Sequence, residues 1–353
     1  MNYRNILTGV AAGLLLFMNT GLGLAAVPQD VPKDVKYILG FYYGNGERIL
    51  IRENQGRLEL LYPAHPQDKC FDLANSYPLE KKHFDSYLLR EAGPMSNTET
   101  AVHFDRDADG YGINCRVGGH SYRRYPMGQQ TGDGGSSFRF PPREDWSELR
   151  QQAAAATVPK GLALGVQAQL VELDAQAGLK LRSVYSTEDN CFGQPLYTST
   201  KLFLDRQAAA ALVRVQQRLA DHGYGILVWD AYRPWSVSLL AHLALPDGDK
   251  QLLEDPWHRG SAHNTGLAVD VSLYDLQTGE EVEMLSGFDE PSIRQYTSYP
   301  GGTARQRYLR SLLREVMELE GFQGIEMEWW HFIYVTEQVY ACLNIPLENI
   351  QEK

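Results

Sequence analysis

The sequence has few cysteines, a shortage of basic residues and, after residue 18, no long apolar run. Its 353 residues include 4 cysteines, 33 lysines and arginines, and 44 aspartates and glutamates, for a net charge of −11. No two cysteines have the Cys-x-x-Cys spacing of zinc ribbons and dithiol redox motifs, which excludes those classes. The acidic balance argues against a nucleic-acid partner, because neutralising phosphates takes clustered lysine and arginine. Without a later apolar run, no segment there predicts a membrane-spanning helix, which needs about 20 residues.

The first 25 residues predict an export signal. Arg4 supplies the positive start, an apolar run extends from Ile6 to Met18, and Gly23-Leu24-Ala25 offers the small residues that a signal peptidase reads. The alternative is an uncleaved anchor at the membrane interface. We expect removal of residues 1–25, a periplasmic or secreted protein, and no stable membrane insertion afterwards.

Export changes what the cysteines predict, because disulfides persist in oxidising compartments. Cys70 and Cys115 both lie in the first half of the chain, so we predict a bridge between them. Whether Cys191 and Cys342 pair stays open. We assign no catalytic role to any of the four.

Residues 34–126 predict a small β-rich domain. Its first part has β-prone runs at residues 37–43, 48–52 and 58–62, separated by Asn- and Gly-containing turns typical of hairpins. Asp105 to Gly110 is similar to the opening of a calcium-binding loop. The twelfth position, however, is Arg116, where that loop needs a bidentate glutamate, so a tight turn is favoured.

A linker at residues 127–159 separates this domain from residues 160–353. The linker has four glycines between Gly128 and Ser137, followed by a connecting helix at about residues 143–156. The rest alternates helix and strand signals, which predicts an α+β domain. The expected helices are 205–222, with Asp205 as its cap, and 303–320. Their predicted buried residues are Ala208, Leu212, Val215 and Leu219, then Tyr308, Leu312, Val316 and Leu319. The expected strands are 225–229, 267–273 and 329–335.

Three segments of this domain combine polar residues with apolar strand residues. In the first, Asp270 lies within an apolar strand and His263 precedes that strand. A bare buried carboxylate is costly, so Asp270 needs a partner, and a metal ion is one such partner. Gly266 allows the chain to turn so that the two side chains converge. Taken alone, this segment fits a core histidine with a strand-end salt bridge about as well.

The other two segments are Glu328-Trp329-Trp330-His331 and Asp230-Ala231-Tyr232-Arg233-Pro234. Positions i and i+3 of a regular strand face opposite ways, so Glu328 shares a site with His331 only from the strand entrance or a bulge. Arg233 follows a predicted strand, where a guanidinium can donate to a carboxylate or an oxyanion. Each segment alone also fits a structural role, namely a Trp-rich core with a salt-bridged Glu328, or an ion pair between Arg233 and Asp230.

Together, the three segments resemble the motifs of the D-alanyl-D-alanine dipeptidase family. His-x-x-Gly-x-Ala-x-Asp, Glu-Trp-Trp-His and Asp-Ala-Tyr-Arg-Pro have that family's order, and Asp189 to Tyr197 is similar to its Asn-Phe-x-Gly-x-x-Leu-Tyr stretch, with Cys191 inserted. The family includes the vancomycin-resistance dipeptidase and is related to zinc D,D-carboxypeptidases. The resemblance covers about residues 168–345 and not residues 26–157.

The resemblance implies a zinc D,D-peptidase-like catalytic domain with one Zn²⁺ per chain, bound by His263, Asp270 and His331. Three protein ligands leave a fourth position for water, as in catalytic zinc sites. Glu328 matches the family's general base, and Arg233 matches the residue that stabilises the scissile carbonyl oxygen.

The resemblance also implies substrate contacts at Ser261, Asp289 and Trp329. Asp289 matches an aspartate that meets the free amino group of a dipeptide. We therefore expect an exported zinc dipeptidase that hydrolyses D-Ala-D-Ala or related cell-wall-derived dipeptides.

Two alternatives remain at this stage. One is a zinc carboxypeptidase or endopeptidase that trims longer peptidoglycan peptides, and Asp289 argues against it because an anchored amino terminus admits only dipeptides. The other is a non-catalytic metal-binding module that recognises the cell wall. Glu328 and Arg233 argue against that module, since neither is needed to hold zinc. The sequence specifies neither the exact dipeptide, nor the oligomeric state, nor the partner of the N-terminal domain.

Overall fold

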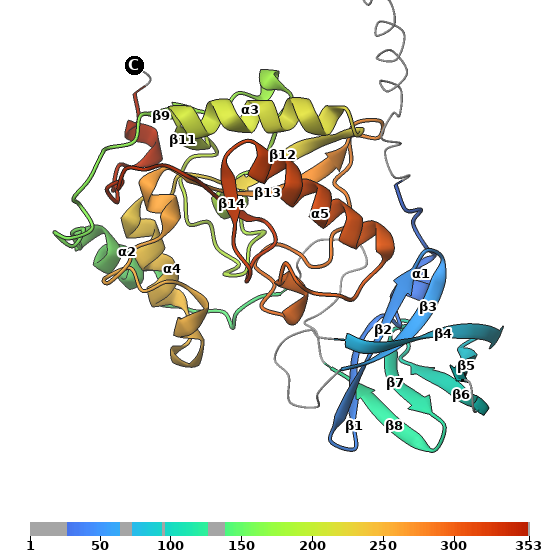
Figure 1. Cartoon of the computed structure of the whole chain (residues 1–353). Coiled ribbons are helices and arrows are strands. Elements are labelled where there is room, and N and C mark those ends of the chain that lie inside the picture. Colours follow the sequence, from blue (N-terminus) through green and yellow to red (C-terminus); the bar gives the residue numbers. More distant parts are fainter. Residues whose placement is uncertain (1–26, 64–72, 94–95, 126–137, 352–353) are drawn as a thin grey trace, which may run out of the picture.

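The structure, a computed structural model, describes residues 27–63, 73–93, 96–125 and 138–351. A closed β-barrel near the N-terminus is followed by a larger domain of helices and strands (Figure 1). The predicted α+β architecture and the predicted β-rich N-terminal domain are thus confirmed. The predicted export signal at residues 1–25 lies outside the described residues. Within the residues that are described, no helix has the length and apolar character needed to cross a membrane.

The helices are α1 (Lys33–Lys36), α2 (Trp146–Ala155), α3 (Arg206–Ala220), α4 (Trp235–Ala244) and α5 (Ala304–Leu319). The barrel strands are β1 (Gly40–Gly44), β2 (Glu47–Asn54), β3 (Arg57–Pro63), β4 (Leu73–His83), β5 (Ser86–Gly93), β6 (Ser96–Arg106), β7 (Gly112–Val117) and β8 (His120–Arg124). The remaining strands are β9 (Leu170–Glu172), β10 (Lys180–Leu181), β11 (Phe203–Asp205), β12 (Tyr224–Asp230), β13 (Ala268–Asp275), β14 (Phe322–Gly324) and β15 (His331–Tyr334).

The barrel is a sequence of antiparallel hairpins that closes when β1 pairs with β8 as well as with β2. Alternate residues point inward and form an apolar core that includes Ile49, Ile51 and Leu60. The first strand begins at Gly40 and not at Tyr37 as predicted. The reason is that α1 ends in a turn in which the Tyr37 N–H donates to the Lys33 carbonyl (3.0 Å).

The suspected calcium loop is a tight turn between β6 and β7, as favoured from the sequence. The Asp107 carboxylate accepts the backbone N–H groups of Asp109 (3.1 Å) and Tyr111 (2.8 Å). A side chain that bonds its own backbone two residues on is typical of an Asx turn.

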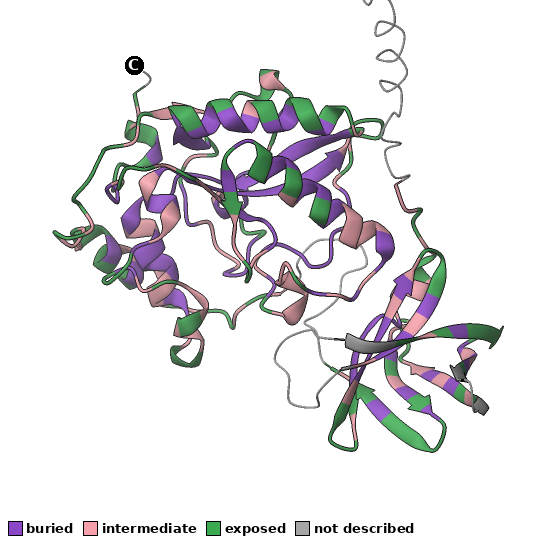
Figure 2. Cartoon of the chain, viewed as in Figure 1, coloured by how far each residue is buried: buried purple, intermediate pink, exposed green. Residues whose placement is uncertain are grey.

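The larger domain is built on a five-stranded sheet in the order β10-β12-β13-β15-β14. Helices α3 and α5 contact each other and pack on β12 and β13, while α2 packs against α4 (Figure 1). The central strands β12 and β13 and the inward helix faces are buried, the edge strands β10 and β14 are partly exposed, and the outer helix faces are exposed (Figure 2). Leu149 and Ala153 of α2 belong to this core, so the expected connecting helix packs as part of the larger domain.

Both predicted long helices are present, and two residues of α5 depart from the predicted burial: Tyr308 is half-buried against the core, and Leu319 is exposed. Asp205 caps α3 by accepting the Gln207 N–H (2.9 Å), and the four predicted core residues of α3 are all buried. In α5 the prediction for Leu319 is wrong, because it is 63% exposed. The buried stripe of α5 follows Leu309, Leu313 and Val316, and Leu319 lies off that face.

Candidate metal centre and active site

Three charged or titratable residues form a row across neighbouring strands of the sheet. Asp230 ends β12, Asp270 lies in β13 and His331 begins β15, and Asp270 is the register partner of both others. A β-bulge between Val228 and Asp230 creates this row, since a regular register would place Trp229 opposite Asp270. Residues directly opposite have Cβ atoms about 4.5–5.5 Å apart, so the pairing itself brings the side chains together.

His263 reaches this row from a 3₁₀ turn, Ala262–Thr265, just before β13. Ser261 caps the turn, and its hydroxyl accepts the His263 N–H (3.3 Å). Gly266 ends the turn with φ of 76°, and a Cβ there would lie 2.8 Å from the Leu170 side chain. The left-handed backbone conformation therefore favours glycine here, and a larger residue would also have to displace the end of the Leu170 side chain. The predicted turn at Gly266 is confirmed.

The ring of His263 is oriented by the backbone. Its Nδ1 donates to the Ala231 carbonyl (2.6 Å), which leaves the Nε2 lone pair directed at the other two residues. His263 Nε2 lies 3.3 Å from Asp270 Oδ2 and 3.2 Å from His331 Nδ1, and the last atom lies 2.9 Å from Asp270 Oδ1. Tetrahedral ligands of zinc are about 3.3 Å apart at normal bond lengths. This donor set fits one metal ion.

The electrostatics of this cluster favour an ionised carboxylate at Asp270. Burial alone would raise the pKa of Asp270, but His263 and His331 hold it below its usual range. Burial lowers the pKa of His263, and Asp270 more than offsets that effect. The cluster therefore keeps the carboxylate ionised, as a metal ligand must be.

Arg233 forms the ion pair that the sequence left open. Its Nε and Nη2 donate to Asp230 Oδ2 (3.0 and 2.7 Å), and its Nη2 lies 4.0 Å from Asp270 Oδ2. The Tyr197 hydroxyl donates to the other Asp230 oxygen (2.8 Å). The guanidinium also stacks over the ring of Tyr185 at 5.0 Å. Arg233 is thus fixed beside the His-Asp-His cluster while still belonging to a structural ion pair.

Glu328 lies in the turn just before β15, at the strand entrance as its spacing from His331 requires. Its Oε2 is 3.9 Å from His331 Nδ1. Removal from water raises the pKa of Glu328 to about 7, with His331 opposing the rise and Asp270 and Asp289 adding to it. A carboxyl group with a pKa close to neutrality can both accept and return a proton at working pH.

Trp329, a predicted substrate contact, is 2% exposed and packs into the wall of the site. Its indole Nε1 donates to the Ser286 hydroxyl (2.8 Å), and its ring lies 5.7 Å from that of Trp229. The backbone N–H of Trp329 donates to the Gln295 carbonyl (2.9 Å). These contacts fix the backbone next to Glu328.

Asp289 lies close enough to Glu328 to act on its pKa, and its backbone is in a left-handed conformation, with φ of 53°. Its Oδ2 accepts from the Tyr185 hydroxyl (2.5 Å) and lies 3.6 Å from the Cys191 thiol. Burial raises the pKa of Asp289 to about 6, with the Tyr185 hydrogen bond opposing the rise and Asp270 adding to it. Tyr185 was not predicted from the sequence; only its place four residues before Asp189, where the resembling stretch begins, could have pointed to it.

The structure gathers most predicted site residues at one end of the sheet. They are His263, Asp270, His331, Glu328, Arg233, Asp289 and Trp329. Ser261 is two residues from His263, and the contacts it makes are those of a cap.

The predicted Cys70–Cys115 bridge is not observed. Cys70 lies outside the described residues, and Cys115 is a buried free thiol inside the barrel, where burial raises its pKa. Cys191 and Cys342 are also buried free thiols, so they are not paired with each other in this structure.

Comparison with known proteins assigns the larger domain to a family. A family model described as D-ala-D-ala dipeptidase, of the Peptidase_M15 type, matches residues 167–346. The site therefore belongs to a peptidase-type domain, and the chain is a member of the D-alanyl-D-alanine dipeptidase family. The predicted family is confirmed.

Individual relatives agree with this assignment. The chain is 31% identical over 173 residues to a D-alanyl-D-alanine dipeptidase of Enterococcus faecium, covering 44% of this chain and 86% of the relative. It is 32% identical over 154 residues to one of Escherichia coli, covering 44% and 78%, and 33% identical over 177 residues to one of Streptomyces coelicolor, covering 44% and 86%.

Proposed function

We propose that the chain is an exported zinc-dependent dipeptidase that hydrolyses D-Ala-D-Ala or a related dipeptide derived from the cell wall. The observation that carries the proposal is the placement of Glu328 beside the His-Asp-His cluster, with its Oε2 3.9 Å from His331 Nδ1 and with the half-buried carboxyl of Asp289 close enough to act on its pKa. Export rests on the sequence of residues 1–25 alone. The same proposal includes that the larger domain is a zinc D,D-peptidase-like catalytic domain.

The metal ligands would be His263, Asp270 and His331, through the three facing donor atoms. When bound, Zn²⁺ supplies Lewis acidity, which polarises a carbonyl and lowers the pKa of a bound water to about 7. The hydrogen bond from His263 to the Ala231 carbonyl fixes the ring tautomer needed for this role.

Glu328 would be the general base. Its raised pKa and its place beside His331 allow it to take the proton of the attacking water and return it to the leaving amine. Arg233, held by Asp230, would donate to the carbonyl oxygen as negative charge develops there. Because the ion pair with Asp230 is already formed, the guanidinium needs little reorganisation.

Asp289 would select the substrate by its length. The half-buried carboxyl of Asp289, which already accepts from Tyr185, offers a second oxygen to a substrate ammonium group. A dipeptide with a free amino end satisfies that carboxylate, whereas an acylated amino end leaves it unpaired, which costs binding.

The test is hydrolysis by the purified, zinc-loaded chain of three substrates: D-Ala-D-Ala, N-acetyl-D-Ala-D-Ala and a pentapeptide ending in D-Ala-D-Ala. We expect cleavage of the first only, loss of activity after dialysis against a chelator, and recovery with added Zn²⁺. Cleavage of the pentapeptide in preference would replace the proposal with a carboxypeptidase. Zinc binding without cleavage of any substrate would indicate the recognition module instead.

A further inference from the structure

One stretch of chain contacts both the active site and the barrel. It runs from residue 283 to residue 303, between β13 and α5, and we refer to it as the 283–303 segment. On the site side it carries Asp289, and its Gln295 carbonyl accepts the Trp329 N–H (2.9 Å). Its Thr297 N–H donates to the Glu326 carbonyl (2.9 Å). The segment thus holds the residues on both sides of Glu328.

On the other side, the segment covers an apolar patch on the outside of the barrel. Phe41, Leu50 and Leu61 point away from the barrel core and form a separate cluster with Leu285 and Tyr299 of the segment. All five are at most 3% exposed, and the rings of Phe41 and Tyr299 are 6.1 Å apart. An outward-facing apolar patch on a barrel this small needs such a cover.

Glu53, at the end of β2, fixes the segment where it enters α5. Its Oε2 accepts the Ala304 N–H (2.7 Å) at the helix N-terminus, and its own N–H donates to the Gly302 carbonyl (3.1 Å). The Arg307 guanidinium donates to the Glu53 carbonyl (2.9 Å). Glu53 is only 2% exposed, so this carboxylate of the barrel serves the larger domain as a helix cap.

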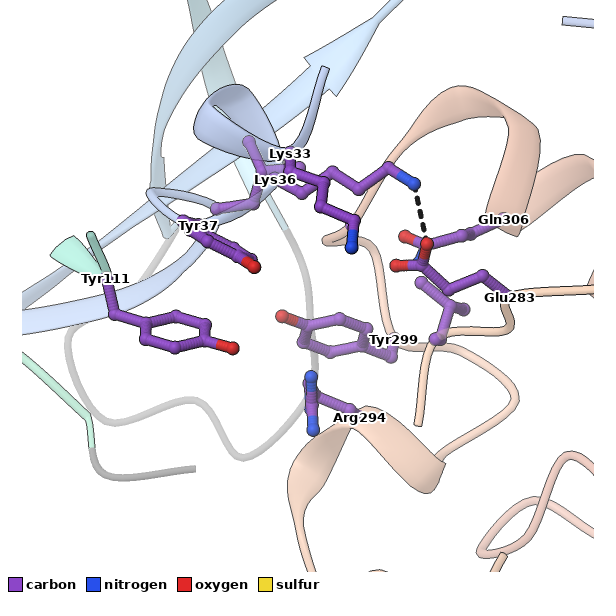
Figure 3. Close-up of a pocket in the computed structure, with 11 residues that line it drawn as sticks. Lys33, Lys36, Tyr37, Tyr111, Glu283, Arg294, Tyr299 and Gln306 are labelled. Carbon is purple, nitrogen blue, oxygen red and sulfur yellow. Dashed lines mark hydrogen bonds and ion pairs between the residues drawn. The ribbon is translucent and has the colours of Figure 1, made fainter. Parts of the chain in front are cut away.

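Polar residues surround this contact, as Figure 3 shows for the pocket beside it. Lys36 of α1 donates to Glu283 of the segment (2.6 Å). Tyr37 and Tyr111, from the barrel side, face Tyr299 across the pocket (Figure 3). An apolar centre with a polar rim is typical of a specific interface.

We propose that the barrel is a positioning element of the active site, with Phe41 and Glu53 as its positioning residues. The inference rests on the proposed dipeptidase function, because the group it positions is the substrate's amino-end contact, Asp289. Between β13 and α5 the segment has one short 3₁₀ turn, Ile293–Gln295, as regular structure. Its path is therefore set by what it packs against, and the barrel supplies one of its two sides.

The conformation of Asp289 supports this dependence. A φ of 53° is unfavourable for most residues other than glycine and persists only where the surroundings fix it. Ser286 and Phe288 are anchored from the site side, by Trp329 and by ring contact with Trp229. Leu285 is anchored from the barrel side. Loss of the barrel anchor frees one end of the stretch that holds Asp289.

The experiment uses the full chain with Phe41→Ala, Glu53→Ala and Glu53→Gln, and with Phe84→Ala as the matched control. Phe84 is an aromatic residue of the barrel that is 69% exposed and lies outside the contact. Hydrogen–deuterium exchange is followed for peptides covering the 283–303 segment and Trp329. Steady-state kinetics with D-Ala-D-Ala give KM and kcat, and competition gives the affinity for N-acetyl-D-Ala-D-Ala.

We expect faster exchange in the segment and at Trp329 for Phe41→Ala and Glu53→Ala, with α3 and α4 unchanged. KM for D-Ala-D-Ala should rise roughly tenfold, the loss expected when a charged hydrogen bond is weakened. Binding of N-acetyl-D-Ala-D-Ala, which lacks the ammonium group, should change much less. Glu53→Gln keeps an acceptor oxygen, so its exchange rates and KM should return most of the way to those of the parent chain. Phe84→Ala should match the parent chain.

Two results would overturn the inference. One is unchanged exchange in the segment for both alanine variants. The other is a parallel loss of protection throughout the larger domain with equal changes for both ligands, which would indicate general destabilisation. If the parent chain does not hydrolyse D-Ala-D-Ala, the proposed function fails, and the exchange data still decide whether the barrel orders the segment.

Discussion

The barrel and the larger domain bury different kinds of residue. The barrel core is apolar. Two carboxylates are buried among the described residues of the barrel, and both have partners: Glu53 accepts the Ala304 N–H, and Asp85 forms an ion pair with Arg106. The larger domain buries a charged cluster at one end of its sheet, consisting of Asp230, Arg233, His263, Asp270 and His331. Buried ion pairs rarely stabilise a fold more than apolar residues of similar size would. Stability therefore explains the barrel core, whereas the cluster needs a functional explanation.

The two regions also differ in how they respond to the removal of one residue. An apolar core residue leaves a cavity, and the cost depends on how far the neighbours relax. A member of a buried charged pair leaves its partner without compensation. Four changes, ordered from the largest expected effect, test this contrast.

The largest effect is expected on turnover and not on folding. Glu328→Gln removes the proposed base but leaves the three donor residues intact, so kcat should fall by roughly 10²–10⁴-fold. Zinc content, measured by metal analysis, should stay at one ion per chain. Glu337→Gln, which changes an exposed glutamate just after β15, is the control. Normal turnover in Glu328→Gln would refute the base assignment, and lost zinc would make Glu328 a ligand.

The next effect concerns the buried ion pair. Asp230→Ala leaves Arg233 buried without its partner, so the larger domain should lose about 3–5 kcal/mol of unfolding free energy. All six tryptophans of the chain lie in the larger domain, so tryptophan fluorescence during urea unfolding reports on that domain alone. The control is Asp105→Ala in the barrel, which breaks an exposed pair with Arg116. It should cost about 0–1 kcal/mol in the barrel transition.

A cavity in the barrel core should destabilise the barrel more than the larger domain. Leu89 is 1% exposed inside the barrel, and Leu89→Ala should cost about 2–5 kcal/mol there. Hydrogen–deuterium exchange of barrel peptides along the same urea series should show an earlier transition of the barrel, while the tryptophan transition of the larger domain moves less. Equal shifts of both signals would mean that the two domains unfold as one unit, and the contrast between the two regions would then fail.

The smallest effect is expected at a helix cap. Asp205→Ala removes the acceptor for the Gln207 N–H at the start of α3 and for the Gln169 N–H (3.0 Å), and should cost about 1–2 kcal/mol of tryptophan-monitored stability. Asp174→Ala, which caps only the 3₁₀ turn Ala175–Ala177, should shift the midpoint less than Asp205→Ala. A larger loss at Asp174 would contradict the capping argument.

The sequence predicted the parts of the site that local pattern determines. Asp270 stands out because an apolar strand does not tolerate an unpartnered carboxylate, and Gly266 because a turn must precede that strand. The resemblance to a family supplied the roles. What local pattern could not predict is the row itself, since the bulge that sets Asp230 opposite Asp270 depends on the pairing of β12 with β13.

The errors have similar physical causes. Leu319 fits a helical stripe by spacing, but which stripe is buried depends on where the sheet lies. Tyr37 is β-prone, but Pro32 and the α1 turn hold it outside the strand. The docking of Phe41 on Tyr299 has no sequence signal at all, because the outward residues of β1 look like those of any strand whose second face is covered.

The closure of the barrel has a consequence for the order of folding. The hairpins from β1 to β8 join near neighbours, but the last seam pairs Tyr42 with Arg124 and must wait for the whole barrel sequence. The Glu53–Ala304 bond spans a longer separation still. Loop-closure entropy makes such distant contacts late. During synthesis we therefore expect the hairpins to form first, the seam next, and the junction with α5 last, so that the segment carrying Asp289 is among the last parts of the chain to become ordered.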